Sequence, residues 1–207
     1  MTSTRTPRAL LVLTLAAALG GPVLLSGCAP LLLGGAVVGG SMMYVDRRTA
    51  GTQVEDQSIE FKSLGEARRV APEGHVNVTS YNRMVLITGE VPREADRQAV
   101  EQAIGRVDNV RSVVNDLVVA EAANIGSRTN DSVISGKVKA SFVDAKDLMA
   151  QAAKVVTERG VVYLMGRVTE REAARFTEVA RAVPGVQKVV RVFEVISEDE
   201  LARLQPR

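Results

Sequence analysis

The chain contains an internal repeat, and a repeat constrains the fold more than any other feature of this sequence. The run Val85–Val91 is matched by Val162–Val168: each is an apolar stretch closed by glycine, one further residue and valine. A second matched pair, Val107–Val114 and Val183–Val190, follows the first at nearly the same distance. The two offsets are 77 and 76 residues, so the copies differ by one residue between these segments. We therefore expect two copies of one small folding unit.

Each copy has the pattern of a small α+β unit. Two apolar strands separated by a two-residue turn predict a β-hairpin, and a helical stretch and a third apolar strand come after it. A further helix is expected before each hairpin, over about 56–70 and 131–149, the second with a break near 143–144. The expected strands and turns are 75–81, 82–83 and 111–119 in the first copy and 153–157, 159–160 and 187–196 in the second. The predicted unit is αββαβ, a three-stranded mixed sheet packed on two helices.

The helix between the second and third strands has the clearer signals in the second copy. Thr169 and Glu172 have the spacing of a capping box. The apolar stripe expected to face the core is Ala173, Phe176, Ala180 and Val183 in this copy, and Ala95, Ala99, Ala103 and Val107 in the first.

The N-terminus is typical of a secretion signal. Two arginines, Arg5 and Arg8, precede an uncharged apolar run that ends at Leu25-Ser26-Gly27-Cys28. This ending resembles the lipobox, at which bacterial lipoproteins are cleaved and lipidated. Cys28 is the only cysteine, so it cannot form an internal disulfide, and we expect it to carry a lipid anchor. An uncleaved membrane helix and an ordinary signal peptide with a chance cysteine are the alternatives. Ala29, where inner-membrane lipoproteins of enteric bacteria carry aspartate, favours the periplasmic face of the outer membrane.

Six segments follow from these patterns. The stretch 31–45 is uncharged and glycine-rich, which favours a flexible or interfacial lead-out from the anchor over a helix that packs through small residues. The expected segments are a signal peptide (1–27), a lipidated tether (28–52), domain 1 (53–121), a linker (122–130), domain 2 (131–196) and a C-terminal tail (197–207).

Charge separates the two copies. Residues 53–121 hold eight basic and twelve acidic residues, whereas residues 127–196 hold twelve basic and eight acidic ones. The first copy is therefore net acidic and the second net basic. Such an asymmetry indicates surfaces that meet different partners, although drift of solvated surface charge would also produce it.

The repeated hairpin with its Gly-x-Val ending resembles the BON domain, and two such domains behind a lipobox resemble the dual-BON outer-membrane lipoproteins. The resemblance covers about residues 45–196 and is strongest at 130–138 and 161–173. It implies an αββαβ sandwich in each domain, no enzymatic activity, binding of anionic phospholipid through the second domain and a role in outer-membrane integrity. Gly89 and Gly166 match the family's hallmark glycine, and we expect a structural role for both, since glycine in a strand permits a close backbone approach.

No catalytic set is found in the sequence. His75 is the sole histidine and is expected to be an ordinary strand residue, and no cluster of histidine and cysteine has the spacing of a metal site. No glycine-rich phosphate loop indicates a nucleotide cofactor. The basic second domain has few aromatic side chains on which bases could stack, which disfavours nucleic acid as a partner. We therefore expect no enzymatic activity, no cofactor and no metal.

The helix from Asp131 has apolar residues on both sides. At about 100° per residue, Ile134, Val138, Phe142 and Ala145 fall on one side, the expected core side. An exposed face should be polar, but here the opposite face is small and apolar and is flanked by lysines. This pattern is typical of a helix that lies shallowly in an anionic membrane surface, although the face could instead pack on domain 1 or the linker. The expected phospholipid-binding residues are Val133, Gly136, Lys137, Lys139, Ala140 and Val143.

Two functions remain open. The first is a lipid-anchored periplasmic protein without enzymatic activity that binds anionic phospholipid through domain 2. The second is an adaptor that docks outer-membrane assembly proteins on the acidic surface of domain 1.

Overall fold

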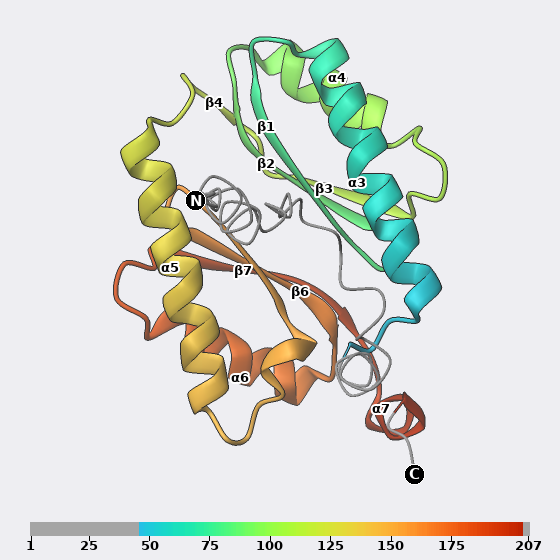
Figure 1. Ribbon diagram of the computed structural model, residues 1–207, viewed down its shortest axis with the longest axis vertical. Helices are drawn as coiled ribbons and strands as arrows, with labels where there is room; N and C mark the ends of the chain where they lie inside the picture. Colours follow the sequence, from blue (N-terminus) through green and yellow to red (C-terminus); the bar gives the residue numbers. More distant parts are fainter. Residues whose placement is uncertain (1–45, 205–207) are drawn as a thin grey trace, which may run out of the picture. The chain divides into compact units, whose positions relative to one another are not determined.

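The computed structural model describes residues 46–204, which form two αββαβ units of the predicted α+β class (Figure 1). Domain 1 consists of α3 (Ala50–Val70), β1 (His75–Tyr81), β2 (Met84–Val91), α4 (Glu94–Ile104), β3 (Ser112–Asn115) and β4 (Val118–Val119). Domain 2 consists of α5 (Ile125–Asp144), the 3₁₀ turn η1 (Ala150–Ala152), β5 (Lys154–Glu158), β6 (Val161–Val168), α6 (Glu170–Arg181) and β7 (Lys188–Val195), followed by α7 (Glu198–Leu204).

Both sheets have the same mixed topology. The second strand lies in the centre, antiparallel to the first strand and parallel to the third, in the orders β1-β2-β3 and β5-β6-β7. In domain 1 the third strand is interrupted after Asn115, and β4 continues the pairing at the far end of β2. The parallel pair is made possible by the helix that crosses between the second and third strands.

Each hairpin turn is held by a buried aspartate of the preceding helix. Asp56 of α3 accepts hydrogen bonds from the backbone N–H groups of Asn82 and Arg83, both at 2.8 Å. In domain 2, Asp131 of α5 accepts from Arg159 and Gly160 at the same distances. All four turn residues have positive φ, as a type I′ turn requires. The repeat therefore includes a helix-to-turn contact that the apolar pattern does not reveal.

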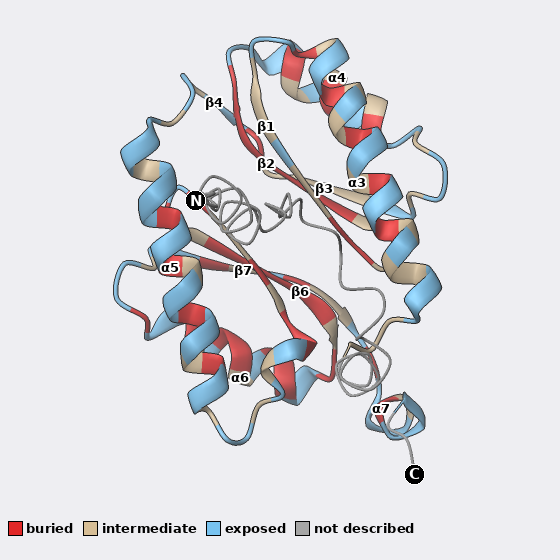
Figure 2. Ribbon diagram, in the orientation of Figure 1, coloured by how far each residue is buried: buried red, intermediate tan, exposed pale blue. Residues whose placement is uncertain are grey.

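Each domain has its own apolar core between the sheet and its two helices. In domain 1, Ile59 of α3 and Val100 of α4 pack on Val85 and Ile87 of β2. In domain 2, Ile134, Phe142 and Phe176 pack on Val162 and Leu164 of β6. The rings of Phe142 and Phe176 meet edge to face with centroids 4.9 Å apart. Figure 2 shows this burial along the inward sides of the helices.

The two helices between the second and third strands differ in how well the sequence predicted them. The capping box of Thr169 and Glu172 is present in α6, and the whole expected stripe of that helix is buried. The stripe expected in α4 was wrong by one position, because Ala95 is exposed and the helix buries Asp96, Val100 and Ile104 instead. Val100 and Ile104 bury more apolar area than alanines do, so they set the rotation of the helix.

The outer faces of the two sheets form a third apolar cluster. It joins residues of β1 and β2 to residues of β6 and β7 and consists of Tyr81, Leu86, Tyr163, Met165 and Val192. Polar contacts surround it: Asn82 donates to Glu194 at 2.6 Å, and the hydroxyl of Tyr163 donates to Asp116 at 2.6 Å. The prediction of helices on one face of each sheet holds, and the other face contacts the other domain.

Several elements extend beyond their expected bounds. α3 begins at Ala50, inside the expected tether, and α5 begins at Ile125, inside the expected linker. α5 ends at Asp144, at the break expected from the sequence. The expected tail contains α7, whose Leu201 is buried.

Candidate functional site

The core side of α5 is formed by the residues that the helical period predicted. Ile134, Val138 and Phe142 are at most 1% exposed, and Ala145, which caps the helix, is half-buried. Asn124 begins the helix by accepting a hydrogen bond from the Ser127 N–H. Because this side of the helix packs in the domain 2 core, the opposite side must point away from that core.

The opposite side of α5 faces solvent. Val133 and Val143 are 49% and 69% exposed, although each is a branched apolar side chain. This face, which we call the α5 outer face, contains the six residues predicted to bind phospholipid, all of them exposed: Val133, Gly136, Lys137, Lys139, Ala140 and Val143. Within residues 46–204, none of the six is buried against domain 1 or the linker, as the alternative required. In Figure 2 the exposed residues run along the length of α5.

The cations of this face are available to a ligand. Nearby Arg48 and Lys154 pair with Asp56 and Glu60 at 2.7 and 2.9 Å. By contrast, neither Lys137 nor Lys139 forms an ion pair with any residue in the range 46–204. Two ammonium groups that have no counter-ion in this range lie beside two exposed valines and give the face both an electrostatic and an apolar component.

A cavity of about 440 Å³ adjoins the C-terminal half of this face. Lys139 and Val143 line it from α5, and Lys154 lines it from β5. Tyr81 lines it from β1, and Asp46 and Arg48 line it from the segment before α3. The Arg48 guanidinium lies 4.1 Å from the centre of the Tyr81 ring. Burial raises the pKa of Tyr81 to about 12, so its hydroxyl is neutral at physiological pH. Three basic residues and one acidic residue line the cavity, so its lining is net basic. The sequence analysis did not predict it because its walls come from four separate segments.

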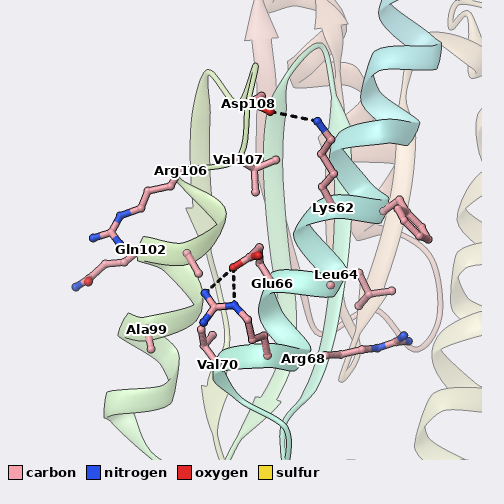
Figure 3. Close-up of a pocket in the computed structure, with 14 residues that line it drawn as sticks. Lys62, Leu64, Glu66, Arg68, Val70, Ala99, Gln102, Arg106, Val107 and Asp108 are labelled. Carbon is pink, nitrogen blue, oxygen red and sulfur yellow. Dashed lines mark hydrogen bonds and ion pairs between the residues drawn. The ribbon is translucent and has the colours of Figure 1, made fainter.

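Domain 1 has a groove of its own between α3 and α4. This groove is drawn in Figure 3, and its volume is about 760 Å³. Phe61, which is 82% exposed, is one of its lining residues. Lys62 of α3 pairs across the groove with Asp108, which follows α4, at 3.3 Å. Arg69 pairs with Glu66 of the same helix at 2.6 Å. Arg68 and Arg106 add further positive charge to the walls. Domain 1 is net acidic, yet this groove is not an acidic surface.

The structure also brings three side chains together that the sequence keeps apart. His75 of β1, Glu90 of β2 and Glu158 of β5 place their ligand-type atoms within 4.8 Å of one another. Glu90 and Glu158 are 1% and 7% exposed. Burial raises the pKa of Glu158, and the nearby charge of Glu90 acts in the same direction. Sequence spacing could not reveal this cluster, since it depends on contact between the two sheets.

The two hallmark glycines lie where a side chain has no room. A Cβ on Gly89 would collide with the carbonyl oxygen of His75, and one on Gly166 with that of Ala152. Gly89 also has a φ of +112°. Both positions are in the central strand of a sheet.

The expected anchor residue Cys28 and the glycine-rich stretch 31–45 lie outside the described residues. Among the helices of the described range, none is both long and apolar enough to cross a membrane.

Comparison with known proteins shows which family the two domains belong to. The model of the BON domain matches twice, over residues 60–121 and 130–197. The chain belongs to the BON-domain family. The outer membrane lipoprotein DolP of Haemophilus influenzae is 34% identical over 186 residues, which cover 88% of this chain and 95% of that protein. A 21 kDa hemolysin of Actinobacillus pleuropneumoniae is 31% identical, covering 73% of this chain and 80% of its own length.

A more distant relative is the osmotically-inducible protein Y of Escherichia coli, which is 26% identical over 117 residues and covers 55% of this chain and 58% of its own length. The match over nearly the full length of the Haemophilus protein identifies this BON-domain protein as an outer-membrane lipoprotein.

Proposed function

We propose that the protein binds anionic phospholipid through the α5 outer face and so supports the integrity of the outer membrane, without catalysing a reaction. The observation that carries the proposal is the exposure of Val133 and Val143 beside Lys137 and Lys139, on a helix whose other side is fixed in the core. A lipid-anchored protein keeps such a face close to a membrane surface, which raises its effective concentration there.

The chemistry of the face suits a shallow position at the interface. An amphipathic helix buries its apolar face a few ångströms into the boundary between headgroups and acyl chains, while basic residues attract anionic lipids. Gly136 and Ala140, between the two valines, leave the helix backbone close to the surface. The basic cavity beside Lys139 offers room for a headgroup next to the inserted side chains.

Vesicle binding tests the proposal. A form comprising residues 46–204 removes the anchor and contains both domains, so only protein–lipid contacts are measured. It should co-sediment with vesicles that contain phosphatidylglycerol and not with pure phosphatidylcholine, and the binding should weaken as salt rises. Val133→Asp should reduce binding at least about tenfold, since it places a charge where an apolar contact forms. Val133→Trp should strengthen it, because indole favours the membrane interface.

Matched controls separate the face from overall charge. Val54→Asp makes the same exchange at an exposed helical valine of domain 1 and should leave binding unchanged. Lys137→Glu should weaken binding about tenfold or more at low salt, since each basic residue near an anionic surface contributes about 1 kcal/mol. Lys188→Glu, at an exposed position on β7, makes the same change in net charge. Equal losses for the two lysine variants would show that net charge, and not this face, governs binding.

The domain 1 groove favours a second candidate, an adaptor for outer-membrane assembly proteins. Its support is the exposed Phe61 beside an apolar hollow between α3 and α4. An adaptor of this kind should lose its partner on Phe61→Ala while vesicle binding persists. If Val133→Asp leaves vesicle binding intact and Phe61→Ala produces the outer-membrane defect, the adaptor function is the correct one.

A further inference from the structure

The side chains of His75, Glu90 and Glu158 form a cluster on the polar edge of the contact between the two sheets. His75 Nδ1 lies 3.2 Å from Glu90 Oε2. The two carboxylates belong to different domains, and both are buried. Two buried carboxylates so close together repel each other, and their removal from water adds a further cost unless a cation compensates.

The cations already present compensate the cluster only in part. Arg159 reaches Glu90 at 3.5 Å, and its side chain is 44% exposed. Glu158 accepts hydrogen bonds from the Asn77 amide at 2.8 Å and, more weakly, from the Thr88 hydroxyl at 3.4 Å, and both of these donors are neutral. In the described part of the chain, Glu158 has no ion pair with an arginine or lysine. The electrostatic deficit is therefore greatest at Glu158.

We infer that His75, Glu90 and Glu158 bind one divalent transition-metal ion of the zinc class, which links domain 1 to domain 2. One imidazole nitrogen with two carboxylate oxygens is a donor set that such ions accept, and Ca²⁺ and Mg²⁺ prefer oxygen ligands alone. Bonds of about 2.0–2.2 Å place tetrahedral ligands roughly 3.5 Å apart, so the observed separations need to shrink by only about 1 Å through side-chain rotation.

The surroundings of the cluster meet two further requirements of a metal site. Ligating side chains need hydrogen-bond partners that fix their orientation, and Asn77 holds Glu158 while the Ala123 N–H donates to Glu90 at 3.2 Å. An ion also needs a path of entry and room for water. A cavity of about 260 Å³ gives both, and its lining includes His75, Glu158, Asp131, Ser132 and Ser135 and one cationic side chain, Arg128.

The experiment uses the full lipidated chain in detergent, stripped of metal and free of a histidine tag, with Zn²⁺ as the probe. His75 is the only histidine, so the ¹⁵N spectrum of the imidazole contains the signals of a single ring. Titration should shift the coordinating nitrogen and saturate at one equivalent. Co²⁺ should give the intense visible bands of a four- or five-coordinate site, and Mg²⁺ in tenfold excess should displace neither ion.

Variants assign the ligands. Glu158→Gln keeps an oxygen that can accept from Asn77 and removes the charge, so it should fold and lose zinc affinity at least about tenfold. His75→Ala and Glu90→Gln should lose at least as much. Asp199→Asn, at an exposed acidic position on α7, is the matched control and should bind as the wild type does.

Two results would overturn the assignment. One is a wild-type imidazole spectrum that does not change at saturating Zn²⁺, which needs no variant to interpret. The other is a zinc affinity of His75→Ala or Glu158→Gln equal to that of Asp199→Asn, which would mean adventitious surface binding. Both results are independent of lipid binding.

Discussion

Replacement of Asp56 by alanine should destabilise the protein more than any surface change on α3. The Asp56 carboxylate is 2% exposed and accepts four hydrogen bonds, from the Ser80 hydroxyl, the backbone N–H groups of Asn82 and Arg83, and the guanidinium of Arg48. Without it the Ser80 hydroxyl, which is fully buried, has no acceptor, at a cost of about 1–3 kcal/mol.

The other three donors are nearer to solvent and contribute less. Arg83 is exposed and Asn82 half-buried, so water can replace the acceptor for their N–H groups. Arg48 keeps its second carboxylate, Asp46, at 2.7 Å. With about 0.5–1.5 kcal/mol for each of these three bonds, the total loss is about 2.5–7.5 kcal/mol. Urea unfolding followed by circular dichroism measures it, with an unchanged slope as the sign that the folded state is intact.

The pH dependence of this loss has a defined sign. Burial by itself would raise the pKa of Asp56, but the hydrogen bonds from Ser80, Arg83, Arg48 and Asn82 outweigh it and lower the pKa below the ordinary value. A lowered folded-state pKa gives stability that is present above the unfolded-state value, about 4, and lost as pH falls through the folded value. The difference in the free energy of unfolding between the wild type and the Asp56→Asn variant should therefore become smaller below pH 4.

Glu66→Ala is the matched control for this prediction. Glu66 lies on the same helix and pairs with Arg69 at 2.6 Å, but the side chain of Arg69 is 66% exposed and that of Glu66 is 39% exposed. Such a pair contributes about 0–1 kcal/mol. If Asp56→Ala cost no more than Glu66→Ala, the carboxylate would not be what holds the hairpin turn, and Asp131 could not be assigned the same role in domain 2.

Two further predictions concern other parts of the chain. Cys28→Ala should abolish incorporation of labelled palmitate and release the protein from the outer-membrane fraction; equal labelling of the variant would exclude Cys28 as the anchor. Gly166→Ala should lower stability by about 1–3 kcal/mol because its Cβ would meet the Ala152 carbonyl oxygen. Gly136→Ala, where no atom lies within 4 Å, should instead raise stability by up to about 1 kcal/mol through helix propensity. Thermal unfolding checks both glycine variants, and a Gly166→Ala protein as stable as wild type would show that the backbones can move apart there.

The repeat, the αββαβ order and the core side of α5 could be predicted because they depend on periods within one segment. The core side of α5 was set mainly by Ile134 and Phe142, which are larger than any apolar residue of the α5 outer face. The prediction of the α4 stripe was wrong because the residues at the predicted positions are small. Its alanines have the right period but bury little area, so Val100 one position along determines the rotation.

Contacts between distant segments could not be predicted from the apolar period within one segment. The roles of Asp56 and Asp131 depend on the position of a distant turn. In the sequence, each aspartate looks like an ordinary charged residue of a helix. The cluster of His75, Glu90 and Glu158 depends on two domains meeting. A histidine and two glutamates separated by 15 and 68 residues have no spacing that indicates a site.

One signal in the sequence did indicate the contact between the sheets. A strand with one face in water alternates apolar and polar residues, whereas β6 contains the continuous apolar run Val161–Met165. Val162 and Leu164 of this run pack on the helices, and Tyr163 and Met165 pack in the cluster shared with domain 1. A strand buried on both faces requires a second covering layer, and the other copy of the repeat supplies it. That contact leaves the α5 outer face uncovered. In the proposed function, the apolar residues of that face contact a membrane and not another part of the protein.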